Sequence, residues 1–76
     1  MTPYRNLNGN SNVESYEIAD DSITVRFKSG RFRNYLYTNQ RPGVVVVDRM
    51  KALAEQGRGL NSYISTIVKS RFARKW

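Results

Sequence analysis

Residues 22–30 read SITVRFKSG and contain the clearest strand pattern in the chain. Ile23, Val25 and Phe27 alternate with polar side chains, which is the two-residue period of a strand that is buried on one face. Ser29-Gly30 follows as a turn dipeptide. The stretch therefore predicts a strand that ends in a tight turn.

Similar patterns lie on both sides of this strand. Tyr16 and Ile18 alternate with polar residues and are followed by Asp20-Asp21, a pair typical of turns. After the second turn, Phe32 and Leu36 again stand at even spacing among polar and amphipathic side chains. We therefore expect three strands that are joined as an antiparallel meander.

Two-residue loops at both turns would place the apolar side chains of the three strands on one face. The other face would then carry four cations and two tyrosines. An alternative exchanges the faces locally and buries one of the tyrosines beneath the helices. In the preferred register the apolar pairs are Ile18 with Ile23, Tyr16 with Val25, Phe27 with Phe32 and Ile23 with Leu36, and the polar face holds Arg26, Lys28, Arg31, Arg33, Tyr35 and Tyr37.

Two amphipathic helices are expected after the strands. Apolar residues recur at helical spacing between Pro42 and Gln56, and Gly57 suits the position just after a helix. A second apolar stripe starts at Leu60 and continues to Phe72. Because an antiparallel sheet tolerates one wet face, both helices are expected to cover the apolar face. The sequence thus predicts an α+β fold of order β-β-β-α-α, a three-stranded antiparallel meander followed by two helices packed on one face.

The length of 76 residues suits one small domain. Residues 1–12 are polar, rich in asparagine and without a period, so we expect a flexible N-terminal arm. Residues 13–72 form the expected single domain, and residues 73–76 form a basic C-terminal tail. The longest apolar run, Val44–Val47, is far too short to cross a membrane. We therefore expect no membrane association and a cytoplasmic location.

The composition excludes much catalytic and metal chemistry. The chain has no histidine and no cysteine, which removes imidazole-based catalysis and zinc–thiolate sites. Thirteen Lys and Arg against six Asp and Glu give a net charge of +7. Residues 1–21 hold one arginine and four carboxylates, whereas residues 22–76 hold twelve cations and two carboxylates. We expect a non-enzymatic module without metal or cofactor, whose basic part binds an anionic partner.

The polar face of the predicted sheet is the first candidate binding site. Cations on a flat sheet neutralise phosphates, and the rings of Tyr35 and Tyr37 offer stacking surfaces for unpaired bases. This combination favours RNA or another single-stranded nucleic acid as the partner. The same residue types also occur on ordinary solvent-facing strands, and that alternative stays open.

Two further basic segments are candidates. Arg58 lies in a Gly-Arg-Gly loop before a helix, where backbone N–H groups can bind phosphates. A simpler alternative is that the glycines only end one helix and start the next. Arg71 and Arg74 lie at the C-terminal end and could contact a phosphate backbone. In the alternative, Phe72 belongs to the core and the basic residues around it only keep the end of the chain soluble. The predicted nucleic-acid-binding residues are Arg26, Lys28, Arg31, Arg33, Tyr35, Tyr37, Arg58, Arg71 and Arg74, and no catalytic or metal-binding residue is predicted.

Several short motifs, spread over most of the chain, form a combination that is typical of one small protein family. They are the strand and turn Ile23–Gly30, the Tyr-x-Tyr motif Tyr35-Leu36-Tyr37, and the helix Met50–Ala54 followed by the glycine loop and asparagine Gly57–Asn61. With these motifs the chain, from about Asn10 to Arg71, resembles the KTSC domain. This small family is found at the C-terminus of some lysyl-tRNA synthetases and as short bacterial and phage proteins. The resemblance implies RNA binding, the proposal attached to a family without an established activity.

Protein binding is the alternative function. The first predicted strand, with Val13, Ser15, Glu17 and Ala19 on its outer face, would be an edge strand open to pairing with another protein. In this alternative the chain is a small adaptor, and its basic surface docks on an acidic protein partner.

Overall fold

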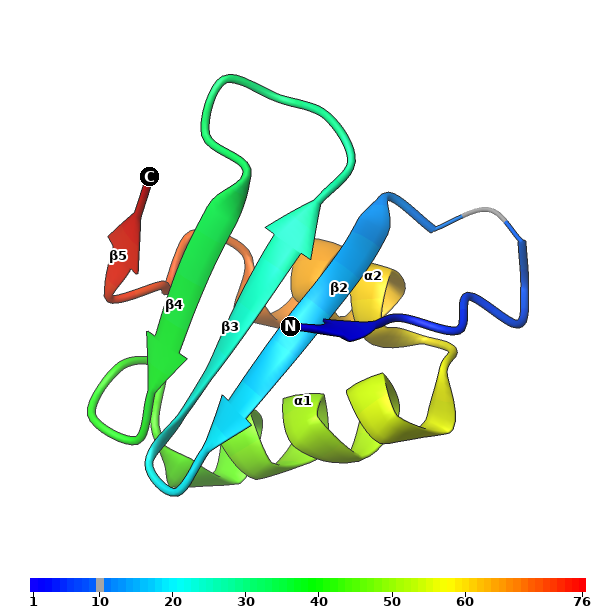
Figure 1. Cartoon of the computed structure of the whole chain (residues 1–76). Coiled ribbons are helices and arrows are strands. Elements are labelled where there is room, and N and C mark those ends of the chain that lie inside the picture. The colour runs from blue at the N-terminus through cyan, green and yellow to red at the C-terminus, as the bar shows by residue number, and fades with distance from the viewer. Residues whose placement is uncertain (10) are drawn as a thin grey trace.

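The computed structural model describes residues 1–9 and 11–76 as one antiparallel sheet with helices on one face (Figure 1). The order of the strands in the sheet follows their order in the chain. The α+β class and the two helical segments on one face are confirmed, and one short strand is added at each edge of the predicted meander. The elements are β1 (Thr2–Pro3), β2 (Val13–Ala19), β3 (Ser22–Phe27), β4 (Asn34–Thr38), α1 (Val44–Gln56), α2 (Leu60–Tyr63), the π-helix η1 (Ile64–Val68) and β5 (Arg74–Lys75).

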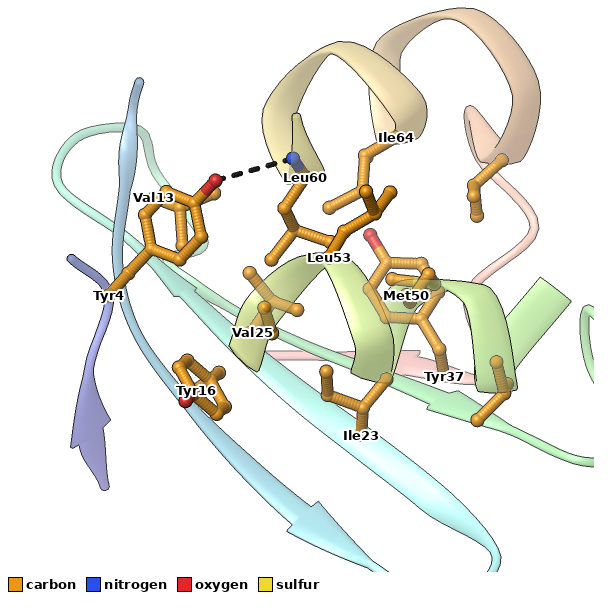
Figure 2. Packing of buried hydrophobic residues seen from close by; sticks show 13 residues of the cluster. Tyr4, Val13, Tyr16, Ile23, Val25, Tyr37, Met50, Leu53, Leu60 and Ile64 are labelled. Carbon is orange, nitrogen blue, oxygen red and sulfur yellow. Dashed lines mark hydrogen bonds between the residues drawn. The ribbon is translucent and has the colours of Figure 1, made fainter. Parts of the chain in front are cut away.

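The hydrophobic core lies between the sheet and the helices (Figure 2). Burial of apolar surface is the main favourable term in folding, so this layer supplies most of the stability. Tyr37 is the largest of the fully buried side chains, with 1% of its surface exposed. Its ring reaches from β4 toward the helices (Figure 2). The other fully buried side chains are Ile23, Met50, Leu60, Val13, Val25, Val47 and Val68.

The pairing of β2 with β3 follows the predicted register over most of its length. Ile18 lies opposite Ile23, and Tyr16 lies opposite Val25, as expected. A bulge then occurs between Val13 and Ser15. A bulge adds one residue to one strand and reverses the alternation beyond it. Val13 is therefore buried in the core, and its predicted place on the outer face is wrong.

The pairing of β3 with β4 differs from the prediction by one residue. Ile23 lies opposite Tyr37, and not opposite Leu36. The connection is residues 28–33, and the predicted two-residue loop at Ser29-Gly30 is wrong. A slip of one residue moves every side chain of a strand to the other face. Tyr35 and Tyr37 consequently face the helices, as in the alternative that exchanges the faces locally.

The helices begin and end close to the predicted positions. The first begins at Val44, two residues after Pro42, and ends before Gly57. Gly57 has a φ of 79°, the left-handed conformation expected of the residue after a helix. The second begins at Leu60 as predicted and continues as the π-helix η1. In the described part of the chain, no helix combines the length and the apolar character that a membrane crossing requires.

The N-terminal segment, predicted as a flexible arm, packs against the domain. Pro3 of β1 pairs with Ser15 of β2, and the side chain of Tyr4 is buried. The Tyr4 hydroxyl accepts a hydrogen bond from the backbone N–H of Leu60 at 3.3 Å (Figure 2). A Cβ atom at Gly57 would lie 2.8 Å from Cβ of Arg5, so the segment approaches the end of α1 closely. Asn10, which belongs to the predicted arm, lies outside the described residues.

The predicted C-terminal tail contains an edge strand. Arg74 lies opposite Leu36, and Lys75 lies opposite Tyr35. The backbone N–H of Trp76 donates to the carbonyl oxygen of Asn34 at 2.9 Å. The backbone of this basic segment is thus bound to β4, which determines where its side chains point.

Replacement of Tyr4 tests whether the N-terminal segment belongs to the folded domain. Tyr4→Ala should lower the free energy of unfolding by about 3 kcal/mol, because it empties a buried aromatic position. Tyr4→Phe should cost about 1–2 kcal/mol, because the N–H of Leu60 loses its partner. Urea denaturation measures both, with the exposed Leu7→Ala as the control. Equal stability of Tyr4→Ala and Leu7→Ala would contradict the packed arrangement.

Candidate nucleic-acid interface

The face of the sheet without helices, here the open face, carries two arginines that are paired with a carboxylate. Arg26 Nε lies 3.5 Å from Glu14 Oε2, and Arg33 Nη2 lies 3.0 Å from the same oxygen. Arg33 Nε also donates to the carbonyl oxygen of Phe27 at 3.1 Å. Such exposed ion pairs contribute little to stability, but the shared carboxylate reduces the attraction of both guanidinium groups for a phosphate. Two of the four predicted phosphate ligands of the sheet are therefore less available to a phosphate.

The aromatic side chain on the open face is a tryptophan, and the predicted tyrosine stack there is wrong. Trp76 is 48% exposed, and the guanidinium carbon of Arg74 lies 5.5 Å from its ring centroid. Both residues alternate with Lys75, which turns toward the helix side of the sheet. The open face thus keeps one arginine–aromatic pair, at the β5 edge.

A groove of about 470 Å³ lies on the helix side, between residues 28–33 and residues 61–72, and we call it the aromatic groove. Its wall consists of aromatic rings from three parts of the chain. Phe27 and Tyr35 meet edge to face with ring centroids 5.3 Å apart, and Tyr35 meets Phe72 in the same way at 5.0 Å. Edge-to-face contacts are favourable, and in each of them the edge of one ring covers one face of the other. Phe32 and Tyr37 complete the aromatic lining.

Cations surround this aromatic wall. Arg31 and Lys69 line the groove, and the guanidinium carbon of Arg31 lies 5.7 Å from the Phe32 ring centroid. Nζ of Lys75 lies 4.9 Å from the Phe32 centroid and 5.3 Å from that of Phe72. None of the described residues that line the groove is an aspartate or a glutamate. The groove therefore combines aromatic surface with unopposed positive charge.

The remaining lining is polar and neutral. Asn12, Asn61 and Ser65 present amide and hydroxyl groups. Burial raises the pKa of the Tyr37 phenol above its usual value, and the neighbouring Tyr35 contributes to the increase. Tyr37 consequently keeps its proton at physiological pH and adds no negative charge. Neutral groups that donate and accept hydrogen bonds, together with ring faces, suit a planar heterocycle.

The backbone at one rim of the groove is irregular. Ile64–Val68 forms a π-helix, and the next residue, Lys69, has φ 54° and ψ −123°. Residues other than glycine rarely adopt a positive φ, and such strain and π-helical turns are concentrated at functional sites. The π-helix and its unusual end place Lys69 at the groove.

The structure divides the nine predicted residues between several places. The groove brings together Arg31, Tyr35 and Tyr37, and Lys28 is exposed in the adjacent connection. Arg58 lines a separate polar hollow of about 90 Å³, which shares Asn61 with the groove. The remaining four are Arg26 and Arg33 at Glu14, Arg74 at Trp76, and Arg71, whose guanidinium donates to the carbonyl oxygen of Ile67 at 2.6 Å.

Two of the other sequence-based hypotheses lose support. The backbone N–H of Leu60, expected to be available for a phosphate beside Arg58, is used by the Tyr4 hydroxyl. The predicted free edge at β2 is covered at Ser15 and Tyr16 by β1. Both changes follow from the packing of the N-terminal segment.

Sequence reasoning missed most of the residues that line the groove. Phe27 and Phe32 were expected in the core, and Lys69, Phe72 and Lys75 were expected only in the C-terminal stripe and tail. An available signal was the cluster of aromatic and basic residues in 31–35 and 69–76. Alternation alone does not reveal that these two segments meet, because β5 brings them together.

Comparison of the chain with protein-family models, with curated proteins and with solved structures gives no match. The resemblance to the KTSC domain therefore stays an expectation from the motifs of the sequence.

The buried phenol of Tyr37 predicts a loss of stability at alkaline pH. Its pKa is raised in the folded protein, so above about pH 10 the unfolded chain loses this proton first. Its contribution is complete below about pH 10 and is lost as the pH rises further, by at most about 1.4 kcal/mol per pH unit. Tyr37→Phe should reduce this alkaline loss, as measured by urea denaturation from about pH 8 to about pH 11. Equal pH dependence of the two proteins would contradict it.

Proposed function

We propose that the protein is a non-catalytic module that binds single-stranded nucleic acid, with cytoplasmic RNA as the favoured partner. The aromatic groove carries this proposal, because it combines ring surfaces with cations and has no carboxylate among its described lining residues. Single-strand-binding proteins use this combination, in which cations hold the phosphates and aromatic rings stack on the bases. The preference for RNA rests on the KTSC resemblance.

Three cations are the proposed phosphate ligands. Arg31, Lys69 and Lys75 lie at the groove and form no ion pair with the described carboxylates. Arg26 and Arg33 share Glu14, so we assign them a smaller role. Arg74 and Trp76 offer a second stacking surface across the sheet.

An acidic protein surface is the second candidate partner, because the same three cations would attract carboxylates. The aromatic wall favours nucleic acid over this candidate, since carboxylates do not require stacking surfaces. The edge of β2 gives the protein-binding alternative less support than expected, because β1 covers part of it.

Removal of the groove cations tests the proposal. In fluorescence anisotropy with labelled single-stranded RNA of about ten nucleotides, affinity should fall as salt rises. Lys69→Ala and Lys75→Ala should each weaken binding and reduce the slope of log affinity against log salt by about 0.7. Arg49→Ala is the matched control, because it removes one positive charge from the exposed side of α1.

Two results would contradict the proposal. The first is binding that does not change with salt. The second is equal weakening by Arg49→Ala and Lys69→Ala, which would mean that only net charge matters. If the protein binds polyglutamate and does not bind RNA, the groove cations instead recognise an acidic protein partner.

A further inference from the structure

We infer that one unpaired base of the bound strand enters the aromatic groove and is held there by its face and by its edge. This inference rests on the proposed function and adds a specific subsite to it. The groove has a volume of about 470 Å³ and is open to solvent, so a base can reach it from the surface.

The ring faces come from both sides of the groove. Phe32 lies in the connection between β3 and β4 and is 39% exposed, although it is a large apolar side chain. Phe72 follows the helices and packs edge to face on Tyr35. The Lys75 ammonium lies within 5.3 Å of the ring centroids of both phenylalanines. A base that stacks on these rings would displace the ammonium from the ring faces, and the flexible Lys75 side chain would then lie beside the base, close to its phosphate.

The edge of the base would meet neutral polar groups. The side chains of Asn61 and Ser65 line the groove and form no hydrogen bond with another residue that the structure describes. An asparagine amide both donates and accepts, as does a hydroxyl, which matches the mixed pattern of a base edge. The protonated Tyr37 phenol lies at the same groove. These groups have no protein partner among the described residues and are available to the edge of a bound base.

Base pairing excludes this mode of binding. In a duplex each base is stacked and paired, so neither its face nor its pairing edge can reach a groove without leaving the helix. A single strand or a strand end presents both. The subsite thus predicts that binding depends on the bases themselves, beyond the number of phosphates.

The experiment compares the affinity of the protein for two strands that contain the same number of phosphates. One is a uridine strand of about ten nucleotides, and the other is a ribose-phosphate strand of the same length without bases. The wild-type protein should bind the uridine strand about ten-fold more tightly or better, the range that stacking supplies. Phe32→Ala and Ser65→Leu should bring this ratio close to one and leave affinity for the abasic strand unchanged. Ser65 is exposed on η1, so leucine there narrows the groove without entering the core.

Two control variants locate the effect. Thr66→Leu places the same side chain on the next residue of η1, which does not line the groove, and should keep the full ratio. Trp76→Ala removes the exposed ring of the open face, the second stacking surface, and should lower the ratio much less than Phe32→Ala does. Loss of the ratio in Trp76→Ala alone would overturn the inference, because the base would then stack on the open face.

Failure of the subsite and failure of the proposed function give different results. If both strands bind with equal affinity and with strong salt dependence, the subsite is wrong and nucleic-acid binding stands. If neither strand binds at low salt, the proposed function is wrong and the subsite fails with it.

Discussion

The pairing of Ile23 with Tyr37 is the contact on which the rest of this structure depends. It places the largest fully buried side chain between the sheet and the helices, where it contributes to the core. The same register turns Tyr35 toward Phe72 and leaves residues 28–33 as a long connection beside the helices. The core and the aromatic groove are therefore consequences of one strand register, and a slip of one residue would remove both.

The distribution of charge matters more for this protein than its total. Arg26 and Arg33 near the open face share Glu14, whereas the cations at the groove have no carboxylate among the described lining residues. An anionic ligand that approaches the two surfaces would meet the same residue types in different electrostatic environments. The groove is the better candidate because its positive charge is unopposed and lies beside ring surfaces.

The chain uses its own ends to complete the sheet. β1 covers part of one edge and places Tyr4 in the core, while β5 pairs with the other edge and places Lys75 at the groove. Uncovered edge strands invite pairing with other chains, so these short strands also limit such contacts. Segments that resembled an arm and a tail thus contribute to folding and to the candidate site.

The sequence alone established the α+β class, the strand that contains Ile23, Val25 and Phe27, the pairing of Ile18 with Ile23 and the helix that ends before Gly57. These features depend on local periodicity, turn residues and the left-handed conformation of a glycine, all of which are visible within a few residues. Only the tertiary structure decided which face Tyr35 and Tyr37 occupy and which cations meet aromatic rings. Those outcomes depend on the length of one connection, on a bulge at Glu14 and on the pairing of β5 with β4, and each is selected by burial across the whole domain.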